Sequence, residues 1–154
     1  MFGFKKFAVA AILATALVTS AVAKDDLSPA DSKAMHDYSL SMDKIKGMQG
    51  AVDDFKMASP AMKQQQKAIG DSSKSIAEMI TKVNAAPQIM AIYRKHGLNA
   101  NDAVLMPFVL MYAGMCVQYP SAASSLAQQT SPAQIAFYKA HQAELQKLNF
   151  LSGK

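Results

Sequence analysis

The sequence predicts an all-α protein, an antiparallel bundle of four to six helices that follows a cleaved signal peptide. The tripeptide Ser-Pro-Ala occurs at 28–30, 59–61 and 131–133. In each copy the serine can cap a helix N-terminus, and the proline fits the first helical position because no N–H is needed there. Apolar residues recur at three- and four-residue steps, and no stretch alternates with the period of a strand.

Residues 1–23 have the three parts of a secretory signal. Lys5 and Lys6 are followed by an apolar stretch at 7–18 and by the small-residue site at 21–23, after which the chain becomes charged. The apolar stretch is shorter than the ~20 residues that a transmembrane helix needs. We therefore expect cleavage after Ala23 and a periplasmic or secreted protein. No cysteine stands at the cleavage site, so no lipoprotein anchor is indicated.

Cleavage would leave residues 24–154 as a single domain with one modest core. It removes two of the 16 basic residues and none of the 11 acidic ones, so the formal net charge falls from +5 to +3. This weak, dispersed charge does not predict a nucleic-acid partner. Cys116 is the only cysteine, which excludes an internal disulfide, and its apolar neighbours predict a buried thiol.

The first half of the mature chain predicts three helices. The first is expected over 29–57, and a short polar helix is expected at 63–67 before a break at Gly70. The third begins at 73–75 and ends before Pro87. The apolar residues expected to face the core are Met35, Tyr38, Met42, Ile45, Val52, Phe55, Ile76, Met79, Ile80 and Val83.

The second half predicts three more helices. One covers 88–96 and ends at Gly97 as a C-cap. The next, 103–117, contains no charged residue; it is read as the central helix of the bundle, because fifteen residues interrupted by Pro107 are too few to span a membrane. Pro107 should kink this helix. The last runs over 132–149 and buries Ile135, Tyr138, Leu145 and Leu148.

The titratable residues form no recognisable catalytic or metal-binding motif. His36, His96 and His141 are far apart, and none has the spacing of a zinc-binding pair. No Ser-His-Asp or Cys-His grouping follows from spacing. The sequence therefore predicts neither an enzyme nor a resident cofactor or metal, and an unrecognised enzyme remains an alternative.

Two carrier functions are further alternatives. Met35 or Met42 on the first helix and His141 on the last could ligate haem iron across a bundle. In this the chain resembles, in architecture only, exported four-helix haem proteins such as cytochrome b562. No Cys-x-x-Cys-His motif is present, which excludes covalent haem attachment. Ten methionines remain after cleavage, and because thioethers select Cu(I), copper carriage is the other possibility.

Two segments, 87–98 leading into the apolar helix and 131–145, resemble a group of short exported helical proteins of bacteria. In that group a Gly-Leu step precedes an apolar helix, and the chain closes on an aromatic-x-x-His-x-x-Glu-Leu helix, here Tyr138 to Leu145. The resemblance implies a periplasmic helical domain and no activity. It makes Phe137, His141 and Glu144 candidate functional positions.

Taken together, these patterns predict an exported binding protein without catalysis. Methionine fills adaptable apolar surfaces well, so we expect an apolar ligand or a protein partner on a Met- and aromatic-lined surface. No transmembrane segment is expected after cleavage. The residues predicted to form this surface are Met106, Met111, Tyr112, Met115, Phe137, His141 and Glu144.

Overall fold

A computed structural model describes residues 27–152, and this part of the chain is helical with no strand. The all-α prediction is thus confirmed. The predicted signal peptide, residues 1–23, lies outside the described residues. The helices, in chain order, are α1 (Pro29–Asp37), α2 (Met42–Met57), α3 (Pro60–Ser72), α4 (Ile76–Asn84), α5 (Pro87–Lys95), α6 (Ala100–Gln118), α7 (Ala122–Ser125), α8 (Pro132–Leu145) and α9 (Asn149–Ser152).

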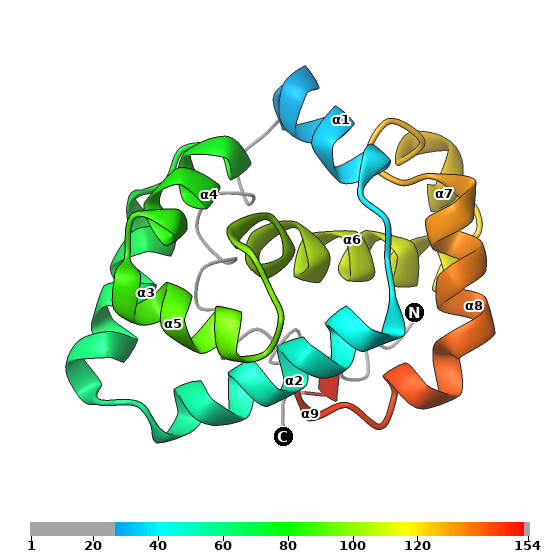
Figure 1. Ribbon diagram of the computed structural model, residues 1–154. Coiled ribbons are helices and arrows are strands. Elements are labelled where there is room, and N and C mark those ends of the chain that lie inside the picture. The colour runs from blue at the N-terminus through cyan, green and yellow to red at the C-terminus, as the bar shows by residue number, and fades with distance from the viewer. Residues whose placement is uncertain (1–26, 153–154) are drawn as a thin grey trace, which may run out of the picture.

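Helix α6 lies at the centre of the fold, as predicted. It packs against α4, α8 and α1 and also touches α2, α5 and α7 (Figure 1). Among the described helices it alone is long and apolar enough to cross a membrane, but 61% of its apolar window is buried inside the protein. Burial by neighbouring helices explains why this segment can be apolar on all sides.

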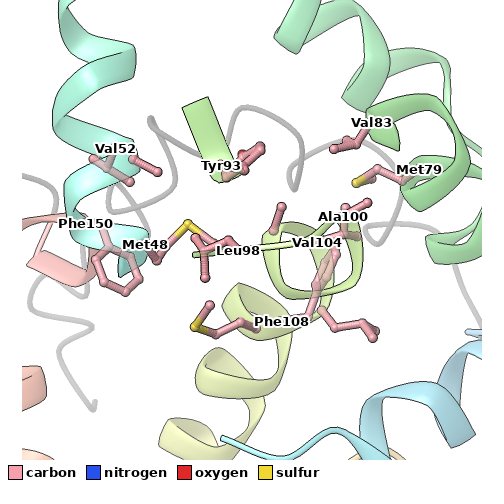
Figure 2. Packing of buried hydrophobic residues seen from close by; sticks show 14 of the residues in the cluster. Met48, Val52, Met79, Val83, Tyr93, Leu98, Ala100, Val104, Phe108 and Phe150 are labelled. Atoms are coloured by element: carbon pink, nitrogen blue, oxygen red, sulfur yellow. The ribbon is translucent and has the colours of Figure 1, made fainter. Parts of the chain in front are cut away.

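The core fills the space between α6 and the helices around it. Figure 2 shows Phe108 and Val104 of α6 close to Leu98, with Met48, Val52 and Phe150 on one side and Met79 and Val83 on the other. Methionine contributes much of this packing, since its flexible thioether fills irregular gaps. The fully or almost fully buried methionines are Met35, Met48, Met79, Met90 and Met106.

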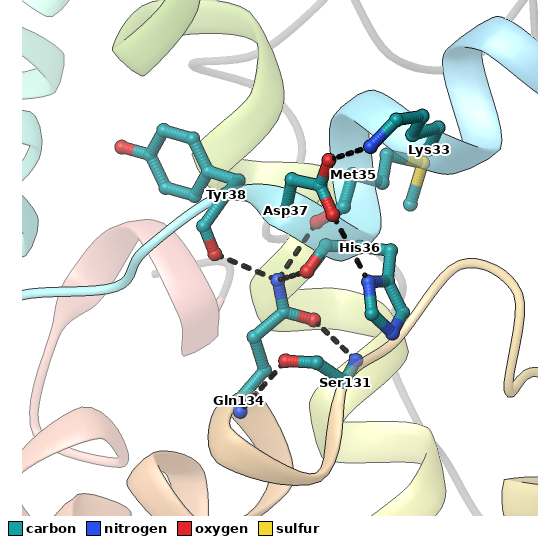
Figure 3. A network of polar contacts seen from close by, with 7 residues as sticks. All are labelled: Lys33, Met35, His36, Asp37, Tyr38, Ser131 and Gln134. Carbon is teal, nitrogen blue, oxygen red and sulfur yellow. Dashed lines mark hydrogen bonds and ion pairs between the residues drawn. The ribbon is translucent and has the colours of Figure 1, made fainter.

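The predicted single helix over 29–57 is wrong, because the chain breaks between α1 and α2. Tyr38 ends α1 in an extended conformation, and Ser41 caps α2 by accepting from the N–H of Lys44 at 3.4 Å. The Gln134 side-chain amide of α8 donates to the carbonyls of Met35, His36 and Tyr38 at 2.7, 3.1 and 2.7 Å (Figure 3). A distant side chain thus satisfies carbonyls that a continuing helix would have bonded.

Local start and stop signals are otherwise mostly confirmed. Ser28, Ser59 and Ser131 each accept from the N–H three residues on, and Ser131 forms its predicted capping box with Gln134. Gly97 has the positive φ of 74° expected of a C-cap glycine.

Three boundaries differ from prediction. Helix α3 begins at Pro60 and continues through the buried Gly70 to Ser72, so the predicted break there is wrong. Helix α6 begins three residues early, because Asn99 and Asp102 form a capping box. Helix α8 stops at Leu145 and the chain turns into α9. These divisions, with the short α7, give more helices in the described region than the four to six expected.

Candidate binding surface

The C-terminal part of α6 and the residue after it carry an exposed apolar surface. Met115 is 40% exposed and Tyr119 is 51% exposed, while Met111 and Tyr112 are half-buried. Met111 and Met115 lie four residues apart on one side of α6, and the C-cap residue Tyr119 follows one turn later, its N–H donating to the Met115 carbonyl at 2.8 Å. We call Met111, Tyr112, Met115 and Tyr119 the α6 surface.

Helix α8 lies against α6 beside this surface. A Cβ added to Gly114 would come within 3.0 Å of the Tyr138 ring and its hydroxyl. The absence of a side chain at Gly114 therefore lets Tyr138 pack directly on the α6 backbone. Burial raises the pKa of Tyr138 and of Tyr112 above the ordinary tyrosine value, so both phenols stay neutral at physiological pH.

The three candidate residues of α8 lie together. The Phe137 and His141 rings have centroids 4.6 Å apart, and His141 Nδ1 lies 3.6 Å from the Glu144 carboxylate. Phe137 and His141 are half-buried and Glu144 is exposed. An aromatic ring with a polar imidazole and a carboxylate beside it suits the rim of an interface.

Met106 differs from the other predicted surface residues. Its side chain is fully buried in the core and so cannot contact a surface partner. Met106 is therefore left out of the α6 surface.

The candidate haem ligands Met35 and His141 are offset from each other along α8. The Met35 carbonyl bonds to Gln134 at the start of α8, whereas His141 lies seven residues farther on, about 10 Å along the helix axis. Met35 is fully buried, and Met42 is half-buried. Within the described residues, no group of three or more His, Cys, Asp or Glu side chains is placed to hold a metal ion.

A second feature is an open groove of about 460 Å³ between α1 and the loop that follows α7. It is lined by Pro29, Ser32, Lys33, His36, Asp37, Ala127 and Gln128. The Asp37 carboxylate pairs with Lys33 and accepts a hydrogen bond from His36 Nδ1 at 3.2 Å. The Lys33 ammonium, and to a lesser degree His36, lower the pKa of Asp37 below its ordinary value.

This groove gathers residue types used in acyl transfer, which form no recognisable motif in the sequence. Ser32 and His36 lie one turn apart on α1, and Asp37 follows His36. The signal available in the sequence was this four-residue step. Serine catalysis also needs the hydroxyl hydrogen-bonded to the base, and no hydrogen bond joins Ser32 to His36 in the described structure.

Comparison with known proteins assigns no family. No protein-family model matches the chain, and no match was found among curated proteins or among solved structures. The resemblance to short exported helical proteins thus stays an expectation, and function must be argued from the residues themselves.

The N-terminus of α6 carries the most buried carboxylate network. Asp102 accepts from Lys44 Nζ at 2.7 Å and from the Tyr38 hydroxyl at 2.8 Å. Burial alone would raise the pKa of Asp102, but the hydrogen bonds from Lys44, the Asn99 N–H and Tyr38 lower it below the ordinary value. The network ties the segment between α1 and α2 to α6, and its role is structural.

The lone cysteine lies just inside the α6 surface. Cys116 is 3% exposed, as predicted, and burial raises the pKa of its thiol. A thiol that stays protonated is a weak nucleophile. Cys116 therefore acts as a small core residue.

Proposed function

We propose that this chain is an exported protein, periplasmic or secreted, that binds a partner protein through the α6 surface and performs no catalysis. The observation that carries the proposal is the exposure of Met115 and Tyr119 at the end of a helix whose other apolar residues are mostly buried in the core. Large apolar side chains exposed side by side mark interaction sites more often than single exposed ones do.

The form and composition of the surface favour a protein over a small apolar ligand. Met115 and Tyr119 stand on the outer side of a helix, whereas small ligands are bound in concave sites that enclose most of their surface. Methionine and tyrosine are enriched in the centres of protein interfaces, and charged groups are depleted there. No charged residue occurs between 103 and 118, while the adjoining helix α8 carries the polar groups of His141 and Glu144.

Site-specific photocrosslinking tests the proposal in cells that export the full chain. A benzophenone amino acid at position 115 should give a covalent adduct of discrete mass, and the second substitution Tyr119→Lys should remove it. The matched control is position 57, because Met57 is 87% exposed but lies at the end of α2, away from the α6 surface. Equal adducts from positions 115 and 57, or none from 115, would contradict the proposal.

The export part of the proposal has its own test. The protein recovered outside the cytoplasm should have the mass of a chain beginning at Lys24. Recovery of the uncleaved chain from the cytoplasm alone would refute it.

A further inference from the structure

The described methionines differ widely in exposure, and exposure governs how fast an oxidant reaches each sulfur. Five of them are at most 2% exposed, and Met42, Met62 and Met111 are half-buried. Among the described methionines, only Met57, at 87%, and Met115, at 40%, have exposed side chains. Oxidation of the folded protein should therefore be confined at first to these two positions.

An oxidant can reach the sulfur of Met115 more easily than that of the neighbouring cysteine. The adjacent Cys116 would ordinarily be the better reductant, but it is 3% exposed. Burial also raises the pKa of its thiol and so keeps it from the reactive thiolate form. A peroxide that approaches this end of α6 thus meets the Met115 thioether before the cysteine.

The reaction needs only a hydroperoxide, for which hydrogen peroxide is the simplest case. A sulfur lone pair attacks one oxygen of hydrogen peroxide, and the O–O bond breaks to release hydroxide. The proton left on the transferred oxygen then passes to this hydroxide, which gives the sulfoxide and one water. The sulfur loses two electrons in forming the sulfoxide, and the peroxide gains them. The product replaces an apolar thioether by a strongly polar group.

We propose that Met115 is an oxidation site and that its sulfoxide switches off binding at the α6 surface, a proposal that rests on the function proposed above. Met111 and Tyr119 lie one turn to either side of Met115, so the sulfoxide would stand in the middle of the surface. Burying it against an apolar partner would cost free energy unless the partner supplied a hydrogen bond. Met57 lies at the end of α2 and is not part of the α6 surface, so its oxidation should have no effect on binding.

The claim that Met115 is an oxidation site is tested on the folded mature protein. The protein is treated with hydrogen peroxide for increasing times, and the oxidation of each methionine is followed by peptide mass spectrometry. Met57 should oxidise first and Met115 second. The half-buried methionines should follow, and the core methionines should react only when the protein unfolds. Oxidation of Met115 at the slow rate of Met106 would overturn the proposal.

The functional half uses the crosslinker at position 119 so that Met115 remains in place. Peroxide should reduce adduct formation about tenfold, a loss typical of one important interface side chain. In Met115→Leu the ratio of adduct after peroxide treatment to adduct before it should stay near one, whatever the amount before treatment, while in the matched Met57→Leu variant this ratio should fall as it does in the parent. Absence of an adduct before treatment would refute the proposed function and the switch together. An adduct that survives Met115 oxidation, or is lost equally in Met115→Leu, would refute the switch alone.

Discussion

The two halves of α6 have similar apolar sequences and different surroundings. In 100–110 nearly every side chain is buried, whereas 111–118 alternates between buried, half-buried and exposed residues. The first half lies among α2, α4 and α5, while the end of α6 is flanked by α7 and α8. The difference teaches that hydropathy predicts which residues can be buried. Which of them are buried depends on the helices that pack over them.

The two halves should differ most in how much the free energy of unfolding falls when one side chain in each is truncated to alanine. Phe108→Ala should lower the free energy of unfolding by about 3–5 kcal/mol, because Phe108 is fully buried and a cavity would remain. Met115→Ala should cost less than about 1 kcal/mol, because much of that side chain already contacts water. Urea unfolding of both variants measures the difference. Equal losses would mean that the two halves are equally covered.

A second prediction concerns what holds α8 against the end of α1. Gln134→Ala removes the amide that satisfies three carbonyls at the end of α1 and should cost about 2–3 kcal/mol. Amide hydrogen exchange should quicken in α1 and α8 more than in α4. Gln134→Glu is the matched control, since it keeps the length but turns an acceptor toward the carbonyls, and it should not restore stability. Uniform quickening across all helices would argue against a local role.

The smallest predicted effect is a pH dependence at the start of α6. The pKa of Asp102 is lowered in the folded protein, so its charged form contributes stability above the unfolded-state value of about 4. This contribution should be lost as pH falls from about 4 through the lowered folded pKa. Asp102→Asn should be less stable than the parent at neutral pH, by about 1–2 kcal/mol, and the gap should narrow in acid. Unfolding curves at several pH values measure it, and a constant gap would contradict the assignment.

Features set by neighbouring residues were predictable from the sequence, and features set by distant ones were not. The caps at Ser28, Ser59 and Ser131 and the turn at Gly97 use residues within one helical turn. The break after α1 has the Ser41 cap as its local signal, but the carbonyls that the break leaves free are bonded by Gln134, almost one hundred residues away. Met106 and Met115 likewise look equivalent in sequence, and only packing separates the core residue from the exposed one.

The hydrogen bonds from Gln134 to the end of α1 also constrain the order in which the helices pack during folding. A chain is synthesised from its N-terminus, so the last carbonyls of α1 can accept from the Gln134 amide only after residue 134 has been made. Contacts between residues so far apart in sequence carry a large loop-closure entropy and tend to form late in folding. We therefore expect α4, α5 and α6 to associate first, and α1 and α8 to close over them together as the final step.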